Sequence, residues 1–268
     1  MGIKMKDGLL TDAITGKLND ELENIATMLE GLPPDSQDWK ARLKAHFDGI
    51  VAEAAQNAPS SPAWDFSAEK GLDSLASDDR LLIRPFREAD IDFYSDVRGQ
   101  WSVISQRMLA LPEVGKSFFL KECQEDYVFY CMIESLPEHA LIGYIALKDT
   151  RRAPWEIAIE LAEDACGHGY GPHAIRLFLR AIKELTGHGE FQACVEADNI
   201  ISQKCMDRAG ARLIGLRADV VLKTDEERVR FEEQNLDKID NNMIAIASLL
   251  GVEPRNLLSH VLDYRFAL

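Results

Sequence analysis

The sequence lacks the features that mark membrane-spanning, disulfide-rich and metal-binding proteins. No apolar run approaches the roughly 20 residues that a helix needs to cross a bilayer, and the opening Met-Gly-Ile-Lys-Met-Lys-Asp does not resemble a signal peptide. The five cysteines are odd in number and show neither zinc-site nor disulfide-framework spacing. We therefore expect a cytoplasmic protein with reduced thiols, no bound metal and no membrane partner.

Basic residues are also scarce relative to acidic ones. The formal net charge is -15 and the calculated pI is about 4.9. This balance argues against a nucleic-acid surface, which needs clustered lysine and arginine to neutralise phosphates. An acidic surface suits cationic acceptors, although more commonly it only keeps a protein soluble.

The 268 residues, 46% of them hydrophobic, can form one large core with a small addition. Residues 1–77 are predicted to form a helical extension and linker, because two apolar stripes at helical spacing precede the breaker sequence Asn57–Pro62. Residues 78–268 then form the main domain. Within it, residues 224–255 are a helical insertion before the last strand, starting at a capping box of Thr224 and Glu227. We expect its apolar stripe to pack on the N-terminal helices.

The main domain has an α+β pattern. Strands are predicted at 81–84, 127–134, 141–148, 155–161 and 191–196, with helices from 89, at 171–186 and at 202–209. Strand-like texture returns at 258–268. This order predicts a mixed, mostly antiparallel sheet flanked by helices, in which a meander leads into a strand–helix–strand crossover.

The stretch most informative about chemistry joins the strand 155–161 to the helix after it. Glycines stand at 167, 169 and 171, and Pro172 falls in the first helical turn. Such a junction directs unpaired backbone N–H groups and the positive end of the helix dipole at one point, as a pyrophosphate requires. Glycines allow phosphates to approach closely, and proline loses nothing where its N–H would be unpaired.

Other interpretations of this loop fit less well. A dinucleotide fingerprint needs Gly-x-Gly-x-x-Gly, but here the third glycine comes one place early. The Gly-Lys-Ser/Thr of a Walker loop is absent. A loop that only turns the chain remains an alternative for the glycines alone.

With its flanking elements, the segment resembles the GNAT superfamily of N-acetyltransferases. Cys166-Gly-His-Gly-Tyr-Gly171 is similar to the acyl-CoA signature Gln/Arg-x-x-Gly-x-Gly/Ala. The resemblance is nearest to the RimJ/RimL-type branch, which acetylates α-amines of ribosomal proteins. Further motifs agree in order, and together they cover about half of the chain: Leu82 to Asp90, Leu141-Ile-Gly-Tyr144, Glu156-Ile-Ala, Asn199-Ile-Ile-Ser202 and Arg208-Ala-Gly-Ala211. Cys166, Pro172, His173 and Ala211 depart from the usual residues, and Met206 replaces a common tyrosine acid.

The resemblance implies acetyl-CoA as cosubstrate and assigns several positions to it. The loop residues Cys166, Gly167, His168, Gly169, Tyr170 and Gly171 would hold the pyrophosphate. A backbone N–H of Ile159 or Leu161 would contact the thioester oxygen, and Asn199 and Ser202 would lie beside the pantetheine and thiol.

Acyl transfer to an amine needs a group that takes a proton from the amine and one that protonates the leaving thiolate. Glu156 and Glu160 share one face of their strand about 13 Å apart, at roughly 3.3 Å per residue, so only one can serve the amine. We favour Glu160, which is nearer the loop, and place Glu156 second. With Met206 in the tyrosine position, Ser202 is the candidate proton donor, although a serine at a helix start is more commonly an N-cap.

Two other uses of the loop residues remain minority interpretations. Cys166, His168 and His173 lack the fourth partner and the spacing of a metal site. Cys166 as an acyl-enzyme nucleophile would depart from the direct transfer that the resemblance implies.

The sequence thus predicts an N-acetyltransferase that moves an acetyl group from acetyl-CoA directly to a primary amine within a ternary complex. The acceptor is a protein α-amine or a small cationic amine, and a homodimer is possible. The alternative is a non-catalytic CoA-binding or scaffold module that acts through its helical additions.

Overall fold

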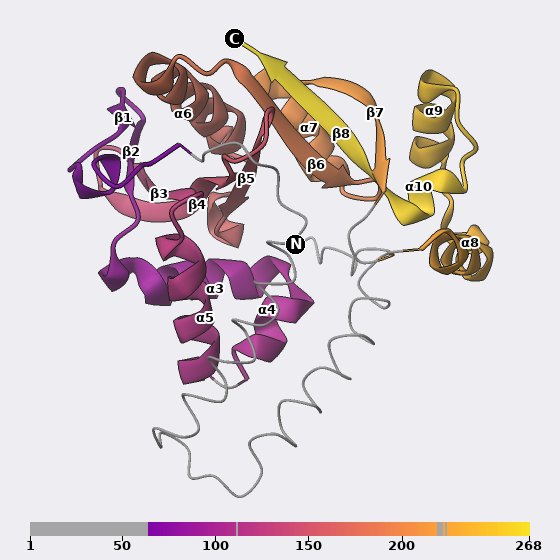
Figure 1. The fold of residues 1–268 in the computed structure, drawn as a ribbon, viewed down its shortest axis with the longest axis horizontal. Coiled ribbons are helices and arrows are strands. Elements are labelled where there is room, and N and C mark those ends of the chain that lie inside the picture. The colour runs from indigo at the N-terminus through magenta and orange to yellow at the C-terminus, as the bar shows by residue number, and fades with distance from the viewer. Residues whose placement is uncertain (1–63, 111, 219–221, 223) are drawn as a thin grey trace, which may run out of the picture.

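The computed structural model describes residues 64–110, 112–218, 222 and 224–268 (Figure 1). The helical hairpin predicted for the first 57 residues lies outside this part of the chain. The described chain contains one sheet of eight strands. These are β1 (Ala76–Ser77), β2 (Leu81–Pro85), β3 (Phe129–Ser135), β4 (Ala140–Asp149), β5 (Trp155–Leu161), β6 (Glu190–Glu196), β7 (Arg212–Ala218) and β8 (His260–Ala267).

The strands lie in the order β1-β2-β3-β4-β5-β6-β8-β7. Every neighbouring pair is antiparallel except β5 and β6, which are parallel. The predicted α+β architecture with a mostly antiparallel sheet is therefore confirmed.

Helices cover both faces of the sheet. They are α3 (Ile91–Trp101), α4 (Val103–Met108), α5 (Pro112–Gln124), α6 (Tyr170–Thr186), α7 (Ile200–Ala209), α8 (Asp225–Gln234), α9 (Asn241–Leu250) and α10 (Asn256–Ser259). In Figure 1, α6 lies on one side of the first five strands and α3 and α5 on the other. Helix α6 buries the apolar residues whose three- and four-residue spacing predicted the helix, and Ile175, Phe178 and Ile182 are fully covered. On the opposite face, Tyr94 of α3 packs on Tyr144 of β4 with ring centroids 4.7 Å apart.

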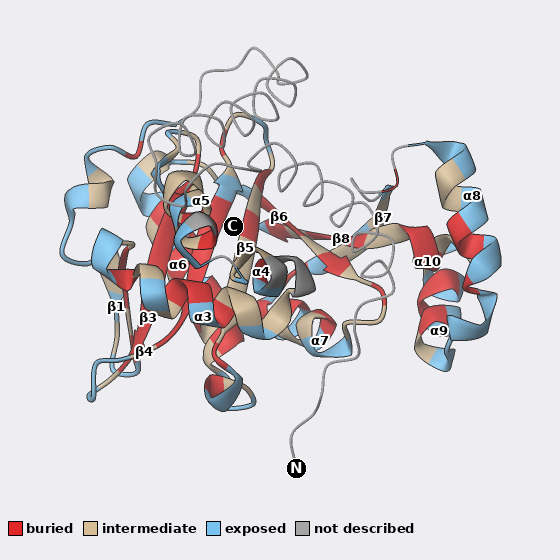
Figure 2. Ribbon diagram, turned by 90° about the horizontal axis from the view of Figure 1, so that it is seen from below, coloured by how far each residue is buried: buried red, intermediate tan, exposed pale blue. Residues whose placement is uncertain are grey.

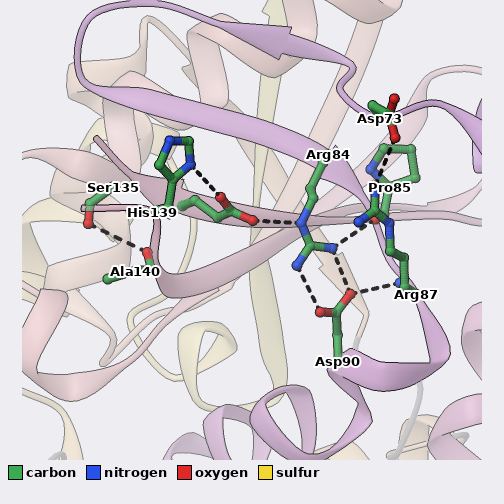
Figure 3. A network of polar contacts seen from close by, with 9 residues as sticks. Asp73, Arg84, Pro85, Arg87, Asp90, Ser135, His139 and Ala140 are labelled. Atoms are coloured by element: carbon green, nitrogen blue, oxygen red, sulfur yellow. Dashed lines mark hydrogen bonds and ion pairs between the residues drawn. The ribbon is translucent and has the colours of Figure 1, made fainter. Parts of the chain in front are cut away.

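A buried ion-pair network fixes the start of α3 to the sheet (Figure 3). The guanidinium of Arg84 on β2 binds both carboxylate oxygens of Asp90 at 2.8 Å and Oε1 of Glu134 on β3 at 2.6 Å. His139 lies 3.1 Å from the other oxygen of Glu134. A bidentate arginine pair fixes orientation as well as distance, so α3 leaves β2 in a defined direction.

The insertion forms a helical unit at one end of the sheet, beyond β7 and β8 (Figure 1). The predicted capping box is present, with Thr224 Oγ1 accepting from Glu227 N–H and a Glu227 carboxylate oxygen from Thr224 N–H. The apolar stripe is divided, because Met243 and Ile246 are buried whereas Leu236 is 51% exposed. Figure 2 shows the alternation of buried and exposed positions along α8 and α9.

Several elements differ from the prediction. Helix α7 begins at Ile200 rather than at Ser202, because Asn199 caps it. Helices α4 and α5 and strand β7 were not predicted. Strand β7 contains Gly215 and a register shift between Leu213 and Gly215, which interrupt the alternation that signals a strand.

Candidate active site

The glycine loop exposes its backbone to open space. Gly167 and Gly169 have φ of 84° and 78°, and a Cβ built on either residue meets no atom within 4 Å. Gly169 is the N-cap of α6, a helix of 17 residues whose first N–H groups have no intrahelical partner. A diphosphate therefore fits here, since the loop offers donors, a helix dipole and room that a side chain would fill.

The turn between β1 and β2 holds this loop in place. Asp78 Oδ2 lies 2.6 Å from Nε2 of His173 in the first turn of α6. Arg80 donates to the carbonyl of His168 at 3.3 Å and lies over the ring of Tyr170, 5.5 Å from its centroid. Burial raises the pKa of Asp78, but hydrogen bonds from two backbone N–H groups and His173 outweigh it, so the pKa lies below its usual value. Sequence reasoning missed Asp78 and Arg80 because they lie about 90 residues before the loop.

The third glycine has a different environment. A Cβ on Gly171 would come within 2.9 Å of Cys205 Sγ on α7, so this glycine allows α6 and α7 to pack closely. Cys166 lies nearby in the loop and contacts the carbonyl of Ala162 at 3.5 Å. Burial and the charges of Glu163 and Asp164 raise the pKa of Cys166. The thiol form therefore dominates at neutral pH, which disfavours an acyl-enzyme on this cysteine.

Strands β5 and β6 separate beside the loop. They pair only at Trp155 with Phe191 and at Glu156 with Gln192, whereas β4 pairs with β5 from Glu156 to Leu161. Because β5 and β6 are parallel, their carboxyl ends lie at the same end of the split. The starts of α6 and α7 follow these ends directly.

The ladder between β4 and β5 determines which backbone groups face the split. Ala162 N–H donates to the carbonyl of Ile142 at 2.9 Å, and hydrogen-bonding direction alternates along an antiparallel pair. The backbone groups of Ile159 and Leu161 therefore face away from β4, toward the side of β6. The carbonyl of Leu161 already accepts a hydrogen bond from Trp101 Nε1 at 2.6 Å.

Asn199 and Ser202 lie at the start of α7, across the split from β5. Asn199 Oδ1 accepts from Ser202 N–H at 3.0 Å. The N-cap of α7 is therefore Asn199. Ser202 does not have the capping role that a serine at a helix start more commonly has. Met206 is buried, with 3% exposure.

Glu160 lies on the face of β5 that is covered by α3. Its cross-strand partner is Tyr144, and its Oε2 is shielded from solvent without a hydrogen-bond partner in the described residues. Burial raises the pKa of Glu160, while the positive charge of Arg98 and a hydrogen bond from Tyr144 lower it in part. A carboxylate with a raised pKa binds a proton more readily near neutral pH than an exposed one.

Glu156 has a different electrostatic setting. Its carboxylate lies 3.0 Å from Lys148 Nζ and 3.6 Å from Arg217 Nη1. Arg217 also donates to Gln192 at 2.6 Å and to Asp263 at 3.0 Å, so it connects β5 to strands beyond the split. The charge of Glu156 is thus compensated by two cations, whereas an oxygen of Glu160 lacks a partner.

An acidic pocket lies between α3 and the segment that follows β5. It has a volume of about 570 Å³ and is lined in part by the carboxylates of Asp96, Glu163 and Asp164 together with Phe93. Negative charge around an apolar ring suits an organic cation.

A sheet split after a short parallel pair, with a glycine loop and a long helix starting at its mouth, defines an acyl-CoA-dependent N-acyltransferase. Acetyl-CoA is its acyl donor. The family model for the acetyltransferase (GNAT) domain matches residues 80–212, and this segment is a GNAT acetyltransferase domain. The predicted superfamily is therefore confirmed.

Several solved structures are similar to this chain. A ribosomal L7/L12 α-N-protein acetyltransferase, RimL, in complex with coenzyme A is 12% identical with a TM-score of 0.50, over 73% of this chain and 98% of that one. A spermidine N-acetyltransferase from Vibrio cholerae in complex with CoA and spermine is also 12% identical, with a TM-score of 0.47 and coverage of 71% and 96%. A ribosomal-protein-S5-alanine acetyltransferase from Vibrio fischeri is 12% identical, with a TM-score of 0.43 and coverage of 71% and 94%. At this identity the likeness concerns the fold alone. No curated protein matches the sequence.

The described residues contain neither a membrane-spanning helix nor a metal-binding cluster. None of the helices there has the length and apolar character needed to cross a membrane. No group of three or more His, Cys, Asp or Glu side chains in the same residues is arranged to hold a metal ion.

Proposed function

We propose that this enzyme transfers an acetyl group from acetyl-CoA directly to a primary amine in a ternary complex, with Glu160 receiving the proton of the amine. The observation that carries the proposal is the shielded carboxylate oxygen of Glu160, without a partner among the described residues, on the strand that ends at the glycine loop. An ammonium group entering from the side of α3 would supply the missing partner. The acceptor is a protein α-amine or a small cationic amine, and the acidic pocket beside α3 favours a positively charged one.

In this mechanism the amine nitrogen forms a bond to the acetyl carbon and the carbon–sulfur bond breaks. Glu160 takes one proton from the ammonium group before the attack. The second proton leaves the nitrogen as the amide forms, and it replaces the proton that a separate donor, for which Ser202 is the candidate, gives to the thiolate of CoA. The N–H of Ile159 or Leu161 would donate to the thioester oxygen, and residues 166–171 would hold the pyrophosphate. Asn199 would keep Ser202 in place through its cap.

Replacing the base gives the central test. Glu160→Gln is expected to lower kcat by about 10² to 10⁴-fold, the usual contribution of a positioned acid or base. Acetyl-CoA affinity should change little, and the loss should shrink at high pH, where the free amine no longer needs a base. Thiol release on a panel of amines measures the rates, and calorimetry measures acetyl-CoA binding.

Glu156→Gln is the matched control, because it removes the same charge from the same face of β5. If that variant shows the pH-dependent loss and Glu160→Gln does not, the base is Glu156. A protein that binds CoA but releases no thiol with any amine would favour the scaffold alternative.

A further inference from the structure

A cluster of tyrosines and charged side chains fills the space between α3, α5 and strands β3 to β5. Arg98 of α3 is at its centre. Its Nη1 lies 3.3 Å from the hydroxyl of Tyr94, 3.5 Å from that of Tyr144 and 3.9 Å from Oε1 of Glu122 on α5. Its guanidinium also lies over the rings of Tyr94 and Phe119, with centroid distances of 5.8 and 5.3 Å.

The cluster reaches Glu160 through Tyr144. These two residues are cross-strand partners on β4 and β5, and the Tyr144 hydroxyl lowers the pKa of the Glu160 carboxyl. Burial raises the pKa of Tyr144 well above its ordinary value, so the hydroxyl stays protonated and can donate. On the other side, Glu122 accepts a hydrogen bond from Tyr130 at 2.7 Å.

Individual atoms of these charged groups are shielded from water. Arg98 Nε, Glu122 Oε2 and Glu160 Oε2 are each shielded from solvent and without a hydrogen-bond partner in the part of the chain that the structure describes. In such surroundings charges influence one another more strongly than at a surface. A change at Arg98 or Glu122 therefore reaches Glu160 although neither residue forms a hydrogen bond with it.

We propose that Arg98 is a positioning residue that holds Tyr144 against Glu160 and, in opposition to Glu122, sets the charge of Glu160 during acyl transfer. The proposal rests on the proposed function, since it assumes that Glu160 is the base. The groups that act on Glu160 come from three elements: Arg98 from α3, Glu122 from α5, and Tyr144 and Lys148 from β4. Tyr94 of α3, Cys123 of α5 and Tyr130 of β3 surround Arg98 and Glu122.

The two charged neighbours act on Glu160 in opposite directions. The positive charge of Arg98 and the hydrogen bond from Tyr144 lower the pKa of Glu160, whereas the negative charge of Glu122 raises it. Removing Arg98 therefore moves the acid limb of the pH–rate profile to higher pH. Removing the charge of Glu122 moves the same limb to lower pH. A merely structural role would reduce activity in both variants without opposite shifts.

The experiment compares the pH dependence of kcat/KM in full-length Arg98→Met, Glu122→Gln and wild type. At the pH where wild type has half its maximal kcat/KM, Arg98→Met should retain at most about a fifth of the wild-type value. Glu122→Gln should exceed the wild-type value there. Arg98→Lys should restore part of the loss, because it returns the charge without the full geometry of the guanidinium.

A second readout does not need an acceptor. The carboxyl carbon of Glu160, labelled with ¹³C and assigned by its absence in Glu160→Gln, should titrate at higher pH in Arg98→Met and at lower pH in Glu122→Gln. If Arg98→Met does not fold, Tyr144→Phe replaces it, because it removes the hydroxyl that lowers the pKa of Glu160 without removing a charge, and the titration is expected to shift in the same direction.

Arg151→Met is the control, since Arg151 is also a half-buried arginine stacked on a tyrosine, 3.7 Å from the ring centroid of Tyr127, but outside the cluster. Three results would overturn the proposal. They are a shift in the same direction for Arg98→Met and Glu122→Gln, no shift in either variant, and an equal shift in Arg151→Met. If wild type transfers no acetyl group, or Glu160→Gln loses no activity, the proposed function fails instead, and the ¹³C titration still decides the coupling.

Discussion

At the scale of single residues, the three loop glycines have two kinds of environment. Gly167 and Gly169 adopt positive φ and face open space, whereas Gly171 is buried against Cys205. A substitution at Gly171 would therefore disturb the packing of α6 on α7, and any effect on phosphate binding could not be separated from that disturbance. Gly169 is the better position for testing the cradle, because asparagine and aspartate tolerate its left-handed conformation.

Gly169→Asp is expected to weaken CoA binding at least about tenfold, equivalent to about 1.4 kcal/mol, because its carboxylate would repel the phosphates. Gly169→Asn has nearly the same size and backbone preference without the charge, so it separates repulsion from strain. Calorimetric titration with CoA measures both. Equal affinities in the two variants would show that the loop does not hold the phosphates.

At the scale of elements, α6 depends on a turn far from it in sequence. The Asp78–His173 pair joins the β1–β2 turn to the first turn of α6, and Arg80 holds the adjoining loop. The position of the helix start, and with it the cradle, is thus set by β1 and β2 as well as by β5.

Asp78→Asn is expected to lower the free energy of unfolding by about 1 kcal/mol at neutral pH, as for a partly exposed hydrogen-bonded pair, and to weaken CoA binding. The pKa of Asp78 is lowered on folding, so its contribution is present above the ordinary pKa of aspartate and is lost as pH falls through the lowered value. The difference from wild type should therefore shrink in acid. Urea unfolding at neutral pH and at about pH 3 measures it.

Asp79→Asn removes the neighbouring, exposed carboxylate and serves as the matched control. If it destabilises the protein as much as Asp78→Asn does, the effect is one of general charge and not of the pair with His173.

The elements that could be predicted from sequence are those with strong local signals. Strand β5 was predicted with its observed bounds, and α6 to within one residue, because alternation and three-to-four spacing are uninterrupted there. Helix α5 was missed because a proline, a glycine and charged residues interrupt its apolar pattern. The cluster around Arg98 could not be predicted, since Arg98 and Tyr144 are 46 residues apart and meet only through the packing of α3 on β4.

At the scale of the whole molecule, the charge of -15 acts on both substrates. A negative surface attracts a cationic acceptor and repels CoA, and salt screens both effects over about 10 Å at 0.1 M. We expect the KM of a cationic amine such as spermidine to rise about two- to tenfold between low and high salt, with kcat little changed. The KM of acetyl-CoA should fall or stay constant. Initial rates at several ionic strengths measure both, and an amine KM that does not depend on salt would contradict the expectation.

The two-pair contact between β5 and β6 also concerns how firmly the fold is held together. Strands β1 to β5 and strands β6 to β8 share only this contact within the sheet. A donor molecule lying between them and hydrogen-bonded to β5 would occupy the place of an absent strand. Its binding free energy would then add to the stability of both halves, by about 2.7 kcal/mol at a concentration 100 times the Kd. The concentration of the acyl donor would thus determine the stability of the folded enzyme as well as its rate of turnover.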